Sequence, residues 1–526
     1  MEIVAGKKYF SYYILFIILY TILIASNSKY NSPHDDFIFL NAFDKGIWTG
    51  IQKSEFLSGR FDVIHGLDLF LLNQINTTGT TTLFYVFSSI IFLLSFLILF
   101  KLIQEFSPSP IIIFLLYFST AFTSIYFRLL YQERYVYLLF LLVQFILLKE
   151  KEVYQLKSIV IILLLSIIVI FYKEPAILSV FFLGLGITTN YYVSKQSSKS
   201  NKYLGFTLMI IPVITIGIYL AFFYPYVDNR YGSNGIPFFL NFIKSLSEWI
   251  LGDPSLFLIF IPLIIIRIIY IYRIREMDIY DSFAMAGLGY MLTFFLIGMA
   301  YSSHYMTPVY AFALPFVLYN QRYLKQYRFL KILIIISILF QTGNITLGIN
   351  DIIFQKFNNK NFTNVIVSLD SITKHNYNSY GKRTTFHVLG GQDQGNHFSW
   401  GALYFMKKKG NTSKMFDFIS FEKITDSTYG HKNVSDVPFS FMNSDIQKEP
   451  KSGDYILFTP YTLIDVKGYQ NKKYILIKHW SAPSYFGYLN FKDLIRTIAY
   501  RLKIMNNNIR DKRSFRVAEY SLYYVR

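Results

Sequence analysis

The stretch Ser32-Pro33-His34-Asp35-Asp36 lies between the first two hydrophobic segments of the chain and opens a polar loop over residues 27–80. After it, apolar side chains recur every three or four positions, at Phe37, Leu40, Phe43, Ile47 and Ile51. This spacing predicts an amphipathic helix that lies on a membrane surface. We therefore expect the two adjacent carboxylates to be held at the boundary between water and lipid.

The composition is that of a polytopic membrane protein. The 526 residues are 53% hydrophobic and 19% aromatic, and the apolar residues form separate blocks of membrane-spanning length. The net charge of +19 comes from short basic clusters between these blocks, so we expect contact with membrane lipid and not with nucleic acid. The chain has no cysteine, which excludes disulfides and thiolate metal sites and favours a bacterial envelope.

The hydropathy pattern predicts about eleven transmembrane helices. We place them at 9–26, 81–103, 109–127, 134–149, 156–172, 176–193, 203–224, 255–272, 283–301, 305–320 and 329–349. Alternate passage through the bilayer gathers more Lys and Arg residues on the side of the N-terminus, which is therefore predicted to be cytoplasmic. The 27–80 loop then faces the outside of the bacterial cytoplasmic (inner) membrane.

Residues 350–526 have the composition of a soluble domain, and the same path places this domain outside the cytoplasm. Strands are predicted at 384–389, 455–459, 473–477 and 516–523, and a helix at 398–408. The expected architecture is a transmembrane domain over 1–349 followed by an extracytoplasmic α/β domain over 350–526.

Asp35 and Asp36 are the candidate catalytic residues. A carboxylate at this position can take the proton of an acceptor hydroxyl as that hydroxyl attacks a sugar carbon. The alternative is that both only stabilise the positive N-terminal end of the following helix.

Other candidates gather at predicted outer turns. Lys173 and Glu174 occupy a tight turn, where a cation can neutralise the phosphate of a lipid-linked sugar. The alternative is that they form only a solvated hairpin turn. The turn before the fourth span carries Arg128, Glu133 and Arg134, which suit phosphate binding or, alternatively, snorkelling and a local Glu133–Arg134 pair.

His304 and Tyr305 begin the tenth span on the same side, where an interfacial histidine can also be structural. A metal site is a weaker hypothesis. His34, Asp62, His65 and Asp68 are oxygen and nitrogen donors in the first loop, but their spacing matches no strong motif. We therefore expect no certain cofactor and leave a divalent cation open.

Four short motifs within residues 1–349 resemble the GT-C class of membrane glycosyltransferases, which includes arabinose, mannose and oligosaccharide transferases. They are the acidic pair, Tyr131-Gln132-Glu133-Arg134-Tyr135, Phe171-Tyr172-Lys173-Glu174-Pro175 and His304-Tyr305-Met306-Thr307-Pro308. The resemblance implies a polyprenyl-phosphate sugar donor and an active site on the outer face of the membrane. It also implies that Asp35 or Asp36 is the base and that Lys173, Arg128 and His304 contact phosphate or sugar. His304 stands where relatives often have arginine.

The sequence thus predicts an enzyme that transfers a sugar from a polyprenyl-phosphate carrier to a glycan, lipid or protein acceptor of the cell envelope. An O-antigen-type polymerase or ligase is the rival enzyme, and would be expected to rely on arginines in large mid-chain loops. A lipid-linked glycan flippase or transporter is disfavoured because charged residues are nearly absent from the middle of the predicted spans.

Overall fold

The structure is a computed structural model. It describes residues 2–27, 64, 66–76, 81–129, 131–150, 153–194, 198–222, 238–296, 299, 301–389, 392–420, 450–460, 474–483 and 518–526. The predicted surface helix over 37–51 lies outside these residues.

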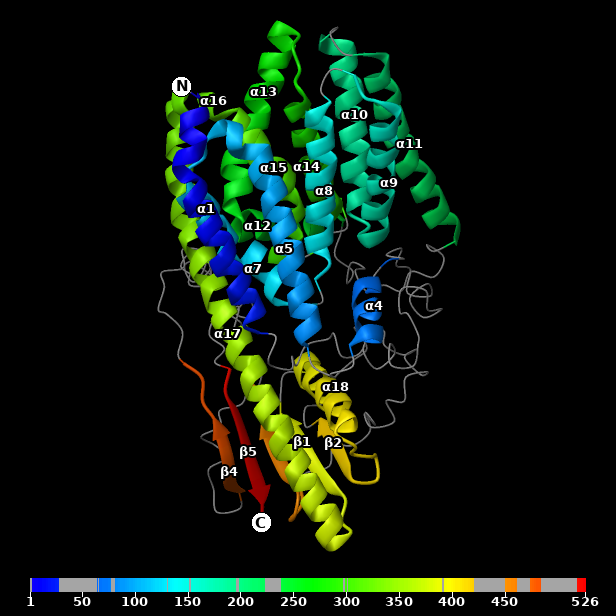
Figure 1. Cartoon of the computed structure of the whole chain (residues 1–526), viewed down its shortest axis with the longest axis vertical. Helices are drawn as coiled ribbons and strands as arrows, with labels where there is room; N and C mark the ends of the chain where they lie inside the picture. Colours follow the sequence, from blue (N-terminus) through cyan, green and yellow to red (C-terminus); the bar gives the residue numbers. More distant parts are fainter. Residues whose placement is uncertain are drawn as a thin grey trace.

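Most of the described residues up to Tyr380 are helical (Figure 1). In order they are α1 (Glu2–Ala25), α4 (Leu67–Ile75), α5 (Thr82–Ile103), the 3-10 turn η2 (Gln104–Phe106), α6 (Pro110–Tyr117), α7 (Thr120–Phe127), α8 (Glu133–Lys149), α9 (Leu156–Tyr172), α10 (Ala176–Ser194), α11 (Lys199–Phe222), α12 (Phe238–Gly252), the π-helix η4 (Leu256–Phe260), α13 (Ile261–Ile274), α14 (Ile279–Leu296), the 3-10 turn η5 (Ser303–Met306), α15 (Thr307–Tyr319), α16 (Gln321–Gln326) and α17 (Arg328–Tyr380).

Each of the eleven predicted spans coincides largely with helix, but fewer are long enough to cross a bilayer. Six helical segments within the described residues are sufficiently long and apolar, and α6 with α7 would make a seventh, bent by 58° at its break. The helices are compatible with a multi-pass membrane protein, whereas the count of eleven spans is not confirmed. α8, α9 and α15 fall short because they have 17, 17 and 13 residues, below the roughly 20 that a bilayer requires.

Glycines allow α10 to approach both α11 and α14 closely. A Cβ atom on Gly184 of α10 would lie 2.6 Å from the carbonyl oxygen of Gly205 on α11, and one on Gly186 would lie 2.6 Å from Cα of Ser282 on α14. Such contacts leave no room for larger side chains. Small residues at helix crossings are the usual means of packing helices within lipid, where the hydrophobic effect does not favour association.

Loops assigned to the same side of the membrane meet at the same end of the helices. At the end far from the sheet, Tyr280 donates a hydrogen bond to Glu105 at 2.6 Å, and Ser194 donates one to the Met277 carbonyl at 2.8 Å. At the end that bears the sheet, called the sheet end below, Trp249 donates a hydrogen bond to the Met299 carbonyl at 2.8 Å. If the chain passes back and forth through a bilayer, the loops predicted on its two sides must lie at opposite ends of the helices, as these contacts do.

α17 connects the two parts of the chain. It runs for 53 residues, passes without a break through the predicted domain boundary at 349/350, and extends along the length of the molecule to the sheet (Figure 1). It ends where Gly381 adopts a left-handed conformation with φ of 63°.

The C-terminal part is a five-stranded sheet in the order β2-β1-β3-β5-β4. The strands are β1 (Thr384–Leu389), β2 (Phe416–Ser420), β3 (Tyr455–Phe458), β4 (Tyr474–Trp480) and β5 (Tyr520–Val525). β1 is parallel to β2 and β3, with α18 (Gln392–Lys408) as the β1–β2 crossover, and β5 is antiparallel to β3 and β4. Helix α18 and all strands except β2 overlap the predicted ranges, although α18 begins six residues earlier than predicted and β5 begins four residues later.

Polar and aromatic contacts attach the sheet to α17. The Asn361 side chain donates to the carbonyl oxygens of Ala518 and Ser481 at 2.8 and 3.0 Å, and Tyr520 donates to Asn358 at 2.6 Å. The rings of Phe362 and Phe398 meet edge to face at 5.3 Å, which brings α18 into the same core.

Candidate functional site

The candidate site begins at the first residue of α8, at the sheet end of the helices. Glu133 is fully buried there, and Lys173 from the α9–α10 turn reaches it with an N–O distance of 3.2 Å. A carboxylate at a helix N-terminus is stabilised by the helix dipole, and the ammonium group supplies the opposite charge. The Lys173 turn is therefore not simply a solvated hairpin.

Tyr305 lies beside this ion pair. The Lys173 ammonium group lies 5.5 Å from the centre of the Tyr305 ring, within the range of a cation–π interaction. The Lys173 side chain is 15% exposed, whereas the Glu133 side chain is completely covered. Lys173 thus connects a buried carboxylate with the surface.

His304 lies in η5, between α14 and α15, and is held between two aromatic rings. Its ring stacks on Tyr131 at 3.9 Å and lies 4.1 Å from the ring of Tyr305, and its Nδ1 is 2.9 Å from the hydroxyl of Ser302. Burial lowers the pKa of His304 to about 4, although nearby Glu133 acts in the opposite direction. His304 is therefore neutral at pH 7 and cannot replace the fixed positive charge of an arginine.

Arg128 connects the site to α17. One Nη atom donates to Asp351 at 2.7 Å and the other to the hydroxyl of Tyr131 at 3.2 Å. The Arg128 side chain is 33% exposed, which makes it the most accessible of the three cations in the cluster. Charge-assisted contacts of this kind fix the orientation of the guanidinium plane.

Arg134, by contrast, is buried and structural. It pairs with Asp68 of α4 at 3.2 Å, and the Tyr135 hydroxyl donates to the same carboxylate oxygen of Asp68. The predicted local pair between Glu133 and Arg134 is not formed, since each has a partner from a different segment. This places Asp68, considered above as a metal ligand, in an ion pair instead.

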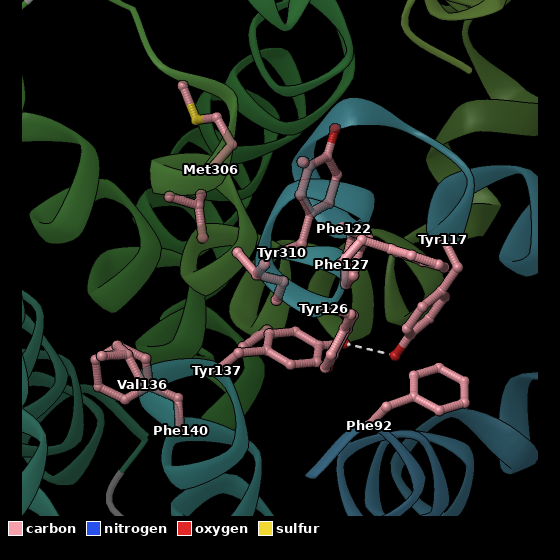
Figure 2. Close-up of a cluster of buried hydrophobic side chains, with 14 of the residues drawn as sticks. Phe92, Tyr117, Phe122, Tyr126, Phe127, Val136, Tyr137, Phe140, Met306 and Tyr310 are labelled. Carbon is pink, nitrogen blue, oxygen red and sulfur yellow. Dashed lines mark hydrogen bonds between the residues drawn. The ribbon is translucent and has the colours of Figure 1, made fainter. Parts of the chain in front are cut away.

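An aromatic cluster next to the site holds its elements together. Figure 2 shows Tyr137 of α8, Phe122 and Phe127 of α7 and Tyr310 of α15 packed against one another, with a hydrogen bond of 3.2 Å between the hydroxyls of Tyr117 and Tyr137. All these side chains are buried. Tyr137, Phe122, Phe127 and Tyr310 each lie within six residues of Arg128, Glu133 or His304. Their packing therefore restricts how those three residues can move relative to one another.

The structure thus brings together most of the site residues that the sequence predicts. Arg128, Glu133, Lys173, His304 and Tyr305 form one cluster, and Arg134 is adjacent to it. Glu174 follows Lys173 in the same turn. The predicted base, Asp35 or Asp36, and the weak metal candidates His34, Asp62 and His65 lie outside the described residues.

Three further polar residues of this region were not singled out from the sequence. They are Asp351, which pairs with Arg128, Gln132, which precedes Glu133, and Tyr290 in the middle of α14. A tyrosine in an otherwise apolar span and a lone aspartate just beyond another span were the available signals.

No metal centre is evident among the residues that the structure describes. Within them, no group of three or more His, Asp or Glu side chains is arranged to hold a metal ion. The cations and carboxylates of the cluster instead neutralise one another in pairs. Chemically, the cluster offers two partly exposed cations, Arg128 and Lys173, beside a buried carboxylate and a neutral imidazole.

Comparisons of the chain with protein-family profiles, with curated proteins and with solved structures found no match. Functional inference therefore depends on the site itself.

Proposed function

We propose that this chain is a membrane glycosyltransferase that moves a sugar from a polyprenyl-phosphate donor to a glycan, lipid or protein acceptor of the cell envelope. The observation that carries the proposal is the convergence of Glu133, Lys173 and His304. These residues belong to motifs far apart in the sequence, yet they meet at one end of the helices. A cluster of charged and polar groups beside apolar helices suits a lipid-linked substrate with a charged head.

Arg128 and Lys173 are the residues suited to the donor phosphate. Both are cations with partly exposed side chains, and both are held in place, Arg128 by Asp351 and Lys173 by Glu133. Arg134 has a covered side chain and serves to fix α4 against α8. Fixed cations stabilise the negative charge that develops on a departing phosphate without having to reorganise.

We propose that the reaction is a substitution at the anomeric carbon of the sugar. The acceptor hydroxyl forms the new C–O bond as the bond from that carbon to the phosphate oxygen breaks, and the polyprenyl phosphate leaves with the bonding electrons. Asp35 or Asp36 takes the acceptor proton. The site faces the outside of the cytoplasmic membrane in this proposal, as the distribution of basic residues predicts.

The test is transfer by the purified protein. The protein is incubated with a panel of radiolabelled polyprenyl-phosphate monosaccharides and, separately, with polyprenyl-diphosphate glycans, in the presence of a membrane-envelope extract as acceptor. Transfer from a monophosphate donor that is lost in Lys173→Ala supports the proposal. Transfer only from diphosphate glycans would instead identify a polymerase or ligase, and transfer from neither would overturn the glycosyltransferase assignment.

A further inference from the structure

The Glu133 carboxylate is poorly satisfied by hydrogen bonds. Both of its oxygens are buried, and among the described residues neither accepts a hydrogen bond of normal geometry, although Lys173 supplies the opposite charge at 3.2 Å. Buried carboxylates in folded proteins nearly always accept hydrogen bonds, because leaving a charged group desolvated and unpaired is costly. An isolated ion pair leaves most of the acceptor capacity of Glu133 unused.

Tyr290, on the neighbouring helix α14, has a hydroxyl without a hydrogen bond among the described residues. Its side chain is fully buried in the middle of α14, and its hydroxyl makes no hydrogen bond with any residue described. Its ring centre lies 6.2 Å from that of Phe140 on α8 and 5.5 Å from that of Phe294, and the Phe294 ring in turn lies 4.7 Å from the ring of Tyr305. Gln132, which directly precedes Glu133, is also buried, and both polar atoms of its side-chain amide are unpaired.

Some buried tyrosines of the helical part use their hydroxyls, whereas the hydroxyl of buried Tyr126, like that of Tyr290, has no hydrogen bond among the described residues. Tyr20 donates to the Tyr117 carbonyl at 2.8 Å, and Tyr310 donates to Asp253 at 2.8 Å. Unsatisfied buried groups therefore also occur elsewhere in the helices. At the candidate site, however, a carboxylate, an amide and a hydroxyl of this kind lie at the start of α8 and on α14, two helices that pack against each other through Phe140 and Tyr290.

The chemistry of the unpaired atoms defines what would satisfy them. Glu133 can only accept hydrogen bonds, whereas the Tyr290 hydroxyl and the Gln132 amide can both donate and accept. A second anion such as phosphate would be repelled by Glu133, and an apolar chain would leave every one of these atoms unpaired. Several neighbouring hydroxyl groups, each a donor and an acceptor, match the set.

We propose that Glu133 and Tyr290, with Gln132, form a hydroxyl-binding subsite that holds the sugar of the donor, an inference that rests on the proposed transferase function. The phosphate is then bound by Arg128 and by the exposed side of Lys173. In this arrangement Lys173 contacts Glu133 on one side and the phosphate on the other, and so sets the distance between the sugar subsite and the phosphate.

The subsite is tested by binding, so that transfer activity is not needed. The purified protein is titrated with polyprenyl-phosphate monosaccharides that differ in the sugar, and with polyprenyl phosphate that has no sugar. We expect the wild type to bind at least one sugar-bearing ligand more tightly than the bare lipid. Tyr290→Phe should reduce this preference about three- to tenfold and leave the affinity for the bare lipid unchanged. Tyr20→Phe removes a paired buried hydroxyl elsewhere and should change neither affinity.

The outcomes separate the two proposals. Sugar-dependent binding that survives unchanged in Tyr290→Phe overturns the subsite, as does a wild type that binds every sugar-bearing ligand no better than the bare lipid. A Tyr290→Phe variant that gains stability with unaltered binding would show that these atoms hold only water. If sugar-dependent binding is lost in Tyr290→Phe but the wild type transfers no sugar, the subsite stands and the transferase function fails.

Discussion

At the scale of single residues, the pairing of Lys173 with Glu133 leads to a prediction that distinguishes the effect of Lys173 on stability from its effect on the reaction. Lys173→Ala leaves a fully buried carboxylate without its cation, so we expect a loss of about 3 kcal/mol in stability, toward the lower end for broken buried pairs because Lys173 is partly exposed. Lys173→Ala combined with Glu133→Gln should regain most of this loss. Thermal unfolding in detergent measures the stability of all three proteins.

Transfer activity should follow a different order. The double variant has no cation for the phosphate, so it should remain as inactive as Lys173→Ala, whereas Lys173→Arg should recover part of the activity because the positive charge remains. A double variant that is both stable and active would assign Lys173 to structure alone.

His304 makes the stability depend on pH. Its pKa is about 4 in the folded protein because the ring is buried, against about 6.5 in an unfolded chain. Between these values the unfolded chain binds a proton that the folded protein does not. The contribution of neutral His304 to the free energy of unfolding is therefore complete above pH 6.5. It is lost as the pH falls to 4, and the total loss is about 3 kcal/mol.

Melting temperatures between pH 7 and pH 4 check this prediction. His304→Gln cannot titrate and should show a shallower decline than the wild type over that interval. His375→Gln, which changes an exposed histidine of α17, should decline as steeply as the wild type. Parallel curves for His304→Gln and the wild type would contradict the assignment.

Asp35 and Asp36 carry the catalytic prediction. Asparagine has nearly the size of aspartate and still caps a helix, but it cannot take a proton. We expect at least one of Asp35→Asn and Asp36→Asn to lose about 10²–10⁴-fold in transfer rate while donor affinity and melting temperature stay unchanged. Substantial turnover in both single variants would rule out the general base, and failure of both to fold would make the pair structural.

At this scale the sequence predicted which residues meet better than it predicted their partners. Glu133, Lys173 and His304 were expected on one side of the membrane because each follows or precedes an apolar run. Arg128 and Asp351 are 223 positions apart, and only the packing of α17 against α7 brings them together. A neighbour in sequence, such as Arg134 for Glu133, is an easier guess and in this case the wrong one.

At the scale of elements, α17 gives a prediction about packing. Gly348 lies where α17 crosses the break between α6 and α7, and a Cβ atom there would overlap the carbonyl oxygen of Phe118. Since Asp351 lies one turn further along the same helix, Gly348→Ala should destabilise the protein by about 1–3 kcal/mol and also disturb the Arg128 contact.

Gly217 of α11 is the matched control, because a Cβ atom there would meet nothing within 4 Å. Gly217→Ala should leave the melting temperature unchanged or raise it, as alanine is the better helix former. Equal melting temperatures for Gly348→Ala and the wild type would mean that α17 can shift away from the α6–α7 break without cost.

The continuity of α17 could not be foreseen from its composition. The segment Asn358-Asn359-Lys360-Asn361 reads as the beginning of a soluble loop, because asparagine competes with the backbone for hydrogen bonds. In the structure these asparagines are buried and use their side chains elsewhere, Asn359 on the Tyr85 hydroxyl and Asn361 on the carbonyl oxygens of the sheet domain. Tertiary contacts thus override a weak local preference. The length of a helix is also hard to predict. The apolar run at 305–320 correctly predicts a helix, but α15 has only 13 residues.

At the scale of the whole molecule, the length of α17 bears on where the sheet lies. Its 53 residues extend about 80 Å at 1.5 Å per residue, whereas the hydrocarbon core of a bilayer is about 30 Å thick. The apolar first part of α17 can therefore lie in the membrane only if its polar second half carries the sheet well beyond the lipid. Sequence composition predicts such a soluble part, and a continuous 53-residue helix is long enough to hold it at a fixed distance from a membrane.

The same geometry predicts the topology, and the absence of cysteine makes it directly measurable. Single cysteines are introduced at four exposed positions, Ser379 and Lys451 at the sheet end and Lys199 and Lys325 at the opposite end. Because basic residues concentrate at the opposite end, that end should face the cytoplasm. A membrane-impermeant maleimide added to intact spheroplasts should label Ser379→Cys and Lys451→Cys only, and all four variants should be labelled after lysis. Labelling of Lys199→Cys and Lys325→Cys in intact spheroplasts, with the other two protected, would place Arg128, Lys173 and His304 on the cytoplasmic side and exclude an outer-face transferase.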